Sequence, residues 1–280
     1  MNIQSAIIEG TNILHNKCIN TAQLDAEILM TKAVGKDKKY LIVNNDKELS
    51  NEKLNLYKKL INERAKRKPI AYLINQKFFW KYNFFVNEDT LIPRPDTEIL
   101  IEQILDITKN KNNLNILDIG VGSGCILLSI LKEKKNFYGT GIDVSKNCLN
   151  ISKINAVNLE VNSRVRFFKS NVDKFNLGKY DLIVSNPPYI NKLDLKYLER
   201  DVVRFEPKLA LDGGLDGLSE IRKVIKKSSE LIKKNGKLIL EIGFDQKNRV
   251  INLLTKKGFY INSISKDLAS NDRCIVSTKI

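Results

Sequence analysis

Histidine is almost absent from this sequence, which contains only His15 among its 280 residues. Serine–histidine–aspartate triads, HExxH zinc sites and facial iron triads all depend on histidine side chains. His15 lies in an N-terminal stretch with helical spacing, where a structural role is the simpler interpretation. We therefore expect neither histidine catalysis nor a metal site.

Cysteine pairs and long apolar runs are also missing. The four cysteines form no C-x-x-C pair, which argues against a disulfide framework or a zinc knuckle and fits a reducing compartment. The longest nearly apolar run, 125–131, is far shorter than the roughly 20 residues that span a bilayer. The first five residues lack the basic and apolar pattern of a signal peptide. These absences predict a cytoplasmic protein without a membrane partner.

Positive charge is plentiful but is not concentrated anywhere. The net charge is +15, with +5 in residues 1–90 and +10 in residues 91–280, so both parts are equally basic per residue. Lysine supplies 37 of the 47 basic residues, which indicates a drift in composition across the chain. The densest cluster, 64–68, follows a predicted helix, where cations favour the helix dipole. We expect a solvated basic surface and no nucleic-acid partner, and RNA or a ribosome-associated factor is the alternative.

The length suits one small and one large domain. Residues 1–68 show apolar positions at helical spacing, with breaks at Gly35 and at 44–46, and predict a small all-helical domain. Residues 69–90 contain the aromatic segment 78–86, which predicts a β-hairpin linker. We interpret its aromatic side chains as interface core and not as a base-stacking platform.

Strands and helices alternate from Leu91 to the end of the chain, which predicts an α/β domain over residues 91–280. Such repeats form a parallel sheet that is covered on both faces, and ligands bind at the carboxyl ends of its strands. Seven strands are expected, at 114–119, 137–143, 165–168, 180–185, 237–242, 259–266 and 273–279. Four helices are expected, at 126–135, 146–158, 218–234 and 248–257.

A glycine-rich loop follows the first of these strands. Its spacing is G-x-G-x-G over residues 120–124, with Asp118 two positions before the first glycine. A dinucleotide fingerprint would need glycine at position 125, where the chain has cysteine. Glycines let a backbone approach a ligand closely, and the next helix offers free N–H groups. The loop alone is a modest indication of a cofactor site, since tight packing is its structural alternative.

Asp143 ends the second strand, 19 residues beyond Gly124. A carboxylate there can accept hydrogen bonds from both hydroxyls of a ribose, and it disfavours a 2′-phosphate. Capping of the next helix is the structural alternative. Because Ser145 is placed to cap that helix, we favour the ribose role for Asp143.

The third loop, Asn186-Pro187-Pro188-Tyr189, follows the fourth strand directly. The prolines make it stiff and remove donors. The Asn186 side-chain oxygen and the Pro187 carbonyl are therefore two acceptors that can hold both hydrogens of an –NH₂ group. Such a grip biases a delocalised nitrogen toward pyramidal geometry and aims its lone pair at an electrophile. Tyr189 offers a flat face against a planar amide or base.

This combination of loops resembles the S-adenosyl-L-methionine (AdoMet)-dependent N-methyltransferases. Within them, several segments resemble the glutamine N5-methyltransferases of peptide release factors (the PrmC/HemK family), and the resemblance runs from end to end. The matching segments are L-I-P-R-P-D-T-E at 91–98, P-I-A-Y-L at 69–73, F-W at 79–80, F-E-P at 205–207, A-L at 210–211 and D-G-G-L-D-G-L at 212–218.

The resemblance implies a seven-stranded, Rossmann-like AdoMet-dependent methyltransferase domain behind a helical substrate-recognition domain. The implied reaction is methylation of the glutamine side chain in the Gly-Gly-Gln motif of class 1 release factors, with S-adenosyl-L-homocysteine as product and no metal. The enzyme is expected to act as a monomer. The implied cofactor residues are Gly120, Val121, Gly122, Ser123 and Gly124 for the methionine end, Asp143 for the ribose, Asn171 and Val172 for the adenine, and Asn186.

The implied substrate residues are Asn186 and Pro187, which are also the catalytic residues, with Pro188 and Tyr189 beside the amide. Asn171 stands where the family usually has aspartate. Transfer is expected to be direct and in line, without a covalent enzyme intermediate, and the proton leaves to water. A DNA or RNA amino-methyltransferase is the alternative, but residues 190–236 are short for a base-reading insert. A non-catalytic binding module is disfavoured because the three loops occur together.

Overall fold

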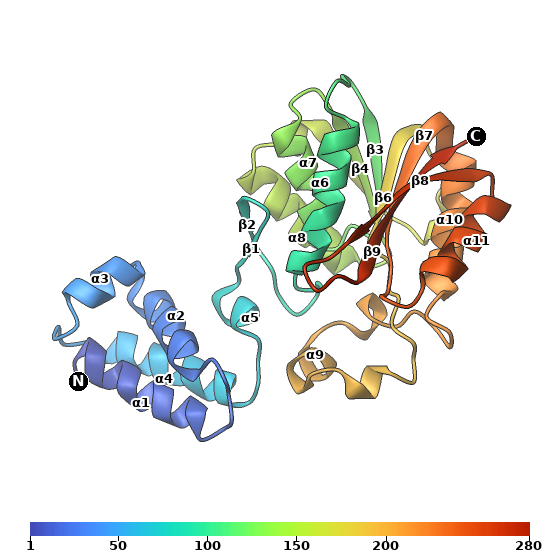
Figure 1. The fold of residues 1–280 in the computed structure, drawn as a ribbon. Helices are drawn as coiled ribbons and strands as arrows, with labels where there is room; N and C mark the ends of the chain where they lie inside the picture. The colour runs from blue at the N-terminus through green and yellow to red at the C-terminus, as the bar shows by residue number, and fades with distance from the viewer. The chain divides into compact units, whose positions relative to one another are not determined.

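The computed structural model describes all residues from 1 to 280. Contacts divide the chain into two compact units, one formed by residues 1–76 with 199–205 and the other by residues 77–198 with 206–280 (Figure 1). The helical unit is thus discontinuous in sequence, a property that the predicted boundaries at 68 and 90 did not anticipate.

The helical unit forms where the sequence predicts helices. The side chains of Asn2, Asp37 and Ser50 cap three of its helices by accepting hydrogen bonds from backbone amides. Gly35 ends another helix in the left-handed conformation. His15 is exposed in the last turn of its helix. The helices are α1 (Ile3–His15), α2 (Ala22–Val34), α3 (Lys38–Val43), α4 (Asn51–Ala65), α5 (Ile70–Ile74) and α9 (Arg200–Phe205).

An ion triad, buried at Arg64 and Asp25 and half-buried at Asp201, fixes α9 within the helical unit. Arg64 Nε lies 2.7 Å from the Asp25 carboxylate, and Arg64 Nη1 lies 2.6 Å from the Asp201 carboxylate. Arg64 belongs to the basic cluster that we interpreted as solvated, so that interpretation is wrong for this residue. Its two carboxylate partners lie far away in sequence. Removing one partner of such a buried pair typically costs about 3–5 kcal/mol.

The predicted hairpin is present but shorter than the predicted linker. Strands β1 (Lys77–Phe79) and β2 (Tyr82–Phe84) pair antiparallel, whereas the start of the predicted linker forms helix α5. Phe79 and Phe84 are buried and meet edge to face. The Trp80 indole donates to Glu133 at 2.9 Å. The hairpin aromatics are therefore mainly packing residues.

The second unit is built on a sheet of seven strands, as the sequence predicts. The strand order is β5-β4-β3-β6-β7-β9-β8. Five adjacent strands are parallel, as predicted, whereas β9 is antiparallel to both β7 and β8, a detail that the prediction did not include. The strands are β3 (Asn115–Ile119), β4 (Tyr138–Asp143), β5 (Val165–Lys169), β6 (Tyr180–Ser185), β7 (Ile232–Glu241), β8 (Phe259–Lys266) and β9 (Asp272–Lys279).

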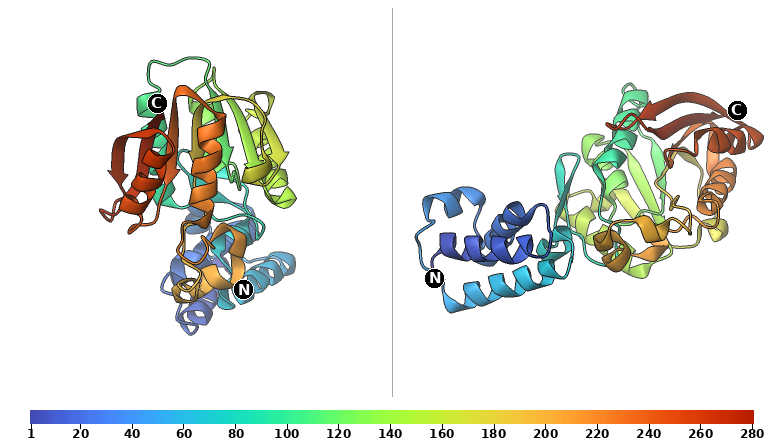
Figure 2. Two further views of the ribbon diagram at one scale, coloured as in Figure 1. Left: turned by 90° about the vertical axis from the view of Figure 1, so that its right-hand side faces the viewer. Right: turned by 60° about the horizontal axis from the view of Figure 1, so that its bottom comes forward.

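Helices cover both faces of this sheet (Figures 1 and 2). Helices α6, α7 and α8 pack together on one face, and α10 and α11 pack together on the other. Helix α6 was not predicted, although its buried Leu100, Ile101 and Ile104 have helical spacing. The helices are α6 (Glu98–Ile107), α7 (Cys125–Glu133), α8 (Lys146–Asn158), α10 (Ser219–Leu231) and α11 (Lys247–Lys256). Short 3₁₀ helices are η1 (Pro95–Thr97), η2 (Asn162–Arg164), η3 (Val172–Lys174), η4 (Leu195–Tyr197) and η5 (Lys208–Ala210).

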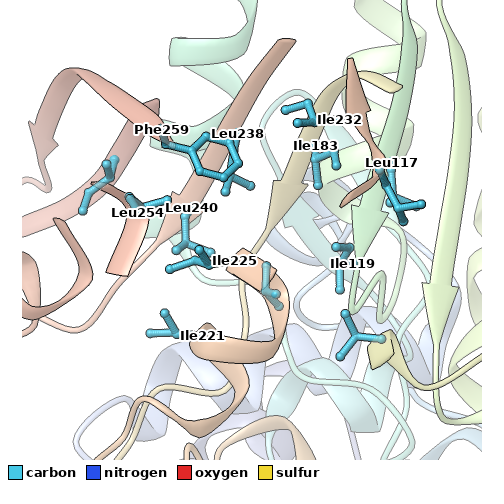
Figure 3. Packing of buried hydrophobic residues seen from close by; sticks show 14 of the residues in the cluster. Leu117, Ile119, Ile183, Ile221, Ile225, Ile232, Leu238, Leu240, Leu254 and Phe259 are labelled. Atoms are coloured by element: carbon cyan, nitrogen blue, oxygen red, sulfur yellow. The ribbon is translucent and has the colours of Figure 1, made fainter. Parts of the chain in front are cut away.

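The core between the sheet and α10 and α11 is mostly aliphatic, with Phe259 among its aromatic members (Figure 3). Leu117, Ile183 and Leu238 come from three adjacent strands and are fully buried, and Ile221 and Ile225 of α10 pack against this cluster. Because this core is closely packed, the strand ends are held in place, and so are the starts of the loops that follow them.

The strand order brings the predicted site loops to one edge of the sheet. The chain runs outward from β3 to β4 and β5, then returns to the other side of β3 with β6 and continues to β7. The carboxyl ends of β4, β3, β6 and β7 are therefore neighbours. The direction in which successive strands are added to the sheet reverses between β3 and β6, and open α/β sheets bind ligands at such a switch point.

Candidate active site

The glycine loop after β3 is open where a ligand would approach. Gly120, Gly122 and Gly124 all have positive φ, at +79°, +54° and +84°. A Cβ added at Gly120 would meet no atom within 4 Å, and one at Gly122 would meet only the Gly120 carbonyl at 3.9 Å. A Cβ at Gly124 would lie 2.7 Å from Leu128, so that glycine serves helix packing. The first two glycines leave a bare backbone surface.

The other two loop residues face inward. Val121 and Ser123 are both buried, at 4% and 3% exposure. Both residues are therefore packed into the protein, and their contact with a cofactor stays a prediction.

Two side chains of α8 brace this loop, and the sequence analysis missed both. Ser152 donates to the Gly122 carbonyl at 2.7 Å, and Asn155 donates to the Ser123 carbonyl at 2.8 Å. Asn155 is fully buried and also bonds both backbone groups of Phe85. Their spacing, three residues apart on the otherwise apolar buried face of this helix, was the available signal.

Asp143 fastens the glycine loop to the end of β4. Its carboxylate accepts from the amides of Gly122 at 3.0 Å and Ser145 at 2.9 Å. Burial raises the pKa of Asp143, and these amides partly offset that effect. Ser145 caps α8, as predicted, by accepting from Cys148 N. Each carboxylate oxygen retains a second acceptor position, which leaves the predicted ribose contact available.

Asp118 is the least satisfied polar group near the loop. It is 1% exposed, and neither carboxylate oxygen makes a hydrogen bond of standard geometry. Burial raises its pKa to about 7, with the negative charge of Asp143 as a smaller contribution and the Leu127 backbone amide acting in the opposite direction. Buried charges are normally paired, so this carboxylate is suited to a cation beside the glycine loop. Its spacing before the first glycine is visible in the sequence, but no role was predicted for it.

Asp118→Asn should change how stability depends on pH. The pKa of Asp118 is raised from 3.8 to about 7 in the folded protein, so between these values the folded state binds more protons than the unfolded state. The unfolding free energy of the wild type then falls as pH rises. The variant lacks this titration. As pH rises from about 4 to 7, its unfolding free energy should therefore increase by roughly 2–4 kcal/mol relative to that of the wild type.

Urea unfolding of both proteins across that pH range measures the difference. Asp106→Asn, the same substitution on an exposed helical residue, is the control. A constant difference between wild type and Asp118→Asn at all pH values would contradict the expected titration.

The predicted adenine residues have other roles within the chain. Asn171 is exposed, and its side-chain oxygen accepts from the Asp173 amide at the start of η3. Val172 is buried and belongs to the core cluster. Contact of this turn with an adenine ring stays a prediction.

The loop after β6 directs the Asn186 side chain. Its Nδ2 donates to the Thr97 hydroxyl at 3.1 Å, which leaves the Asn186 oxygen available as an acceptor. Asn186 is half-buried, Pro187 is buried, and Pro188 is half-buried. Asn186 thus lies at the switch point between β3 and β6, and the Pro187 carbonyl as a second acceptor stays a prediction.

Tyr189 contacts two charged residues that were not predicted from the sequence. Its hydroxyl donates to Glu241 Oε1 at 3.2 Å, and Arg273 Nη1 lies 3.4 Å from the same hydroxyl. The Arg273 guanidinium stacks 5.9 Å from the ring centroid and also pairs with Asp267. Burial raises the pKa of Tyr189. One face of the ring is therefore occupied by Arg273.

Glu241 lies at the end of β7 behind this loop. It is 1% exposed, and its Oε2 has no hydrogen-bond partner. Burial raises its pKa to about 7, against the opposing influence of Thr97, Arg273 and Tyr189. The carboxyl is a buried acceptor at the base of the site.

A second glycine loop supports the backbone of Pro188 and Tyr189. A Cβ at Gly213 would lie 2.9 Å from the Pro188 carbonyl, and one at Gly217 would lie 2.6 Å from the Tyr189 carbonyl. The buried Gln246 side chain donates to the carbonyls of both Tyr189 and Gly217. These contacts explain the glycines of the 212–218 segment.

The thiols near the site are poor nucleophiles. Burial raises the pKa of Cys125 to about 12 and that of Cys148 to about 11. A thiol with such a pKa is almost wholly protonated near neutral pH. This property agrees with the expectation that no covalent enzyme intermediate forms.

Two further findings concern metal sites and membrane-spanning helices. No three histidine, cysteine, aspartate or glutamate side chains are grouped so that they could hold a metal ion. None of the helices combines the length and apolar character required to cross a membrane.

Comparison with known proteins gives two domain families. Residues 5–74 match the PrmC N-terminal domain, and residues 95–209 match the methyltransferase small domain. Among solved structures, a methyltransferase from Pyrococcus furiosus has a TM-score of 0.54 at 19% identity, covering 70% of this chain and 88% of that chain. This likeness shows the methyltransferase fold.

Relatives extend over the whole sequence. The release factor glutamine methyltransferase of Clostridium botulinum is 36% identical over 282 residues, which cover 100% of both chains. The protein of the same description from Caulobacter vibrioides is 35% identical, over 93% of this chain and 91% of its own. A bifunctional methyltransferase of Rickettsia bellii is 35% identical over 98% of this chain, and the chain spans 54% of that longer protein.

Proposed function

Because the chain belongs to the release factor glutamine methyltransferase family, we propose that it methylates the side-chain amide nitrogen of the Gly-Gly-Gln glutamine in class 1 release factors, with AdoMet as methyl donor. One observation carries the proposal: Asn186 points its donor end at Thr97, so its oxygen is left free as an acceptor for the substrate. Two acceptors suit a primary amide, which has two N–H groups and a weakly nucleophilic nitrogen.

The residues at the carboxyl edge fit AdoMet. Gly120 and Gly122 provide the bare backbone, Asp118 is an unpaired carboxylate for a cation, and Asp143 has acceptor capacity for a ribose. Val121, Ser123 and Gly124 complete the loop, and Asn171 with Val172 forms the turn that we assign to the adenine. When bound, AdoMet supplies an electrophilic methyl group on a sulfonium centre.

The chain's own contribution is positioning. Asn186 Oδ1 and the Pro187 carbonyl each accept one N–H of the substrate amide, which weakens its conjugation and directs the nitrogen lone pair. Pro188 stiffens the loop, and Tyr189, fixed by Glu241 and Arg273, limits where the amide can lie. Bringing reactants together in this way can contribute several kcal/mol to rate acceleration. After the N–C bond forms, the extra amide proton leaves to water.

We propose that residues 1–68 recognise the release factor and that the enzyme acts as a monomer in the cytoplasm. This proposal is supported by relatives described as release factor glutamine methyltransferases, which are covered over 100% and 91% of their own length. Nucleic acid is not proposed as substrate, because the segment after Tyr189 contains only α9 and two short 3₁₀ helices before Ser219.

The test is incubation of the protein with methyl-labelled AdoMet and, in parallel, purified class 1 release factors or duplex DNA. We expect label in the release factor, mapped by peptide mass spectrometry to the Gly-Gly-Gln glutamine. A release factor with that glutamine replaced by alanine is the matched control and should stay unlabelled. Label in DNA alone would overturn the substrate and favour an exocyclic base nitrogen as acceptor.

A further inference from the structure

Thr97 links the sequence segment before the sheet to the chemistry at the end of β6. It is 2% exposed, and its hydroxyl accepts from Asn186 Nδ2 at 3.1 Å across 89 positions of the chain. Thr97 ends the short helix η1, and its amide donates to the Arg94 carbonyl. The I-P-R-P-D-T-E segment thus brings one hydroxyl to the back of the proposed methyl-acceptor site.

The position of Thr97 is fixed by a second long-range contact. Arg94 Nη2 lies 2.5 Å from Glu206 Oε1, and the Ile92 amide donates to the other oxygen of the same carboxylate. Glu206 is 5% exposed. The segment that carries Thr97 is therefore anchored on both sides of Pro93, and the hydroxyl has little freedom to move away from Asn186.

We propose that Thr97 is a positioning residue that determines which end of the Asn186 carboxamide faces the methyl acceptor. The proposal deepens the proposed function and rests on it. An asparagine side chain has an oxygen and an NH₂ group of nearly equal size, so shape alone does not select its orientation. A fixed acceptor on one side selects the orientation in which NH₂ faces that acceptor and oxygen faces the opposite side.

Glu241 explains why the Thr97 hydroxyl acts as an acceptor toward Asn186. A threonine hydroxyl has one proton and two lone pairs. The buried Glu241 carboxylate neighbours this hydroxyl and can take its proton in a hydrogen bond, and its Oε1 also accepts from the Tyr189 hydroxyl. A lone pair of Thr97 then remains for Asn186 Nδ2. In this series of hydrogen bonds, Asn186 donates to Thr97 and Thr97 donates to Glu241.

The reversed orientation of Asn186 would place an NH₂ group against the N–H groups of the substrate amide. Two donors would face each other there, and the Asn186 oxygen would lose its partner at the substrate. The grip that activates the glutamine nitrogen would be absent, although the site would still have the same shape. Thr97 therefore influences the rate of transfer through Asn186 and should have little influence on cofactor binding.

Thr97→Val is the informative variant because it keeps the shape and removes the hydroxyl. We expect kcat to fall by about tenfold to a hundredfold, the loss expected from one buried hydrogen bond that positions a reacting group. The dissociation constant of AdoMet, measured by calorimetry, should stay within about twofold. Thr97→Ser, which restores the hydroxyl, should keep kcat within about threefold of the wild type. In an Asn186→Ala background, Thr97→Val should cause no further loss.

A readout independent of transfer separates this proposal from the proposed function. In ¹⁵N-labelled protein, the Asn186 side-chain NH₂ signals, identified by their loss in Asn186→Ala, should exchange slowly with solvent in the wild type and in Thr97→Ser. Exchange should be faster in Thr97→Val. This result would stand even if release factors were not methylated. A lack of methylation would overturn only the proposed substrate.

Three results would overturn the role of Thr97. They are unchanged NH₂ exchange in Thr97→Val, additive losses of Thr97→Val and Asn186→Ala, and equal losses in kcat and AdoMet affinity. If Thr97→Val does not fold, as shown by thermal unfolding, the comparison moves to Thr97→Ser and Thr97→Ala, and loss of protection in both would also overturn the proposal.

Discussion

Asn186→Ala should lower the rate of methyl transfer to the release factor by about 10²–10³-fold, the cost of removing one preorganised polar group from a reaction centre. Alanine removes the oxygen that would hold one N–H of the substrate amide. The glycine loop, Asp118 and Asp143 do not contact the Asn186 side chain through any hydrogen bond. AdoMet affinity should therefore stay within about threefold of the wild type.

Single-turnover labelling gives the transfer rate, and calorimetry gives the AdoMet dissociation constant. Asn191→Ala is a matched control, because Asn191 lies in the same loop and its side-chain oxygen bonds only the nearby Leu193 amide. We expect Asn191→Ala to transfer methyl groups at close to the wild-type rate. Equal losses of rate and affinity in Asn186→Ala would show that Asn186 binds cofactor and does not grip the substrate.

Gly213→Ala should have the second-largest effect. The added methyl group would lie 2.9 Å from the Pro188 carbonyl oxygen, from the Tyr189 carbonyl carbon and from the Gly217 carbonyl oxygen. All three are backbone atoms, so relief requires the loop after β6 to move. Overpacking of this kind typically costs about 1–3 kcal/mol of stability. A displacement of about 1 Å at the reacting groups can cost about a hundredfold in rate.

The expected result for Gly213→Ala is a protein that folds, binds AdoMet and transfers methyl groups about a hundredfold more slowly. Thermal unfolding, calorimetry and single-turnover labelling measure these three properties. Gly35→Ala is the control, since a Cβ there meets no atom within 4 Å and only its φ of +72° is unfavourable. Wild-type turnover in Gly213→Ala would mean that the 212–218 loop does not position Pro188 and Tyr189.

The sequence predicted those parts of the structure that depend on nearby residues. Ser145 caps a helix that begins at the next residue, and β6 ends directly before Asn186. Both features follow from local pattern. The seven strands were predicted for the same reason, because each is a short apolar segment between turn residues.

The sequence did not predict contacts between distant segments. Tyr189 meets Glu241 across 52 positions and Arg273 across 84, and no local pattern encodes such pairs. Arg64 was interpreted as solvated because its immediate neighbours are basic. In the structure it pairs with Asp25 and Asp201, which are distant in sequence. Antiparallel addition of β9 was missed because strand direction depends on where the chain returns, which periodicity does not record.

The pairing of Arg64 with Asp201 has a consequence for how this protein can be recombined. The chain enters the helical unit twice, first as residues 1–76 and again as residues 199–205. A chimaera that exchanged only the first 76 residues with those of a relative would pair a foreign α4 with the native α9. Compatible exchange must carry both pieces, so residues 1–76 and the segment 199–205 are constrained to diverge together.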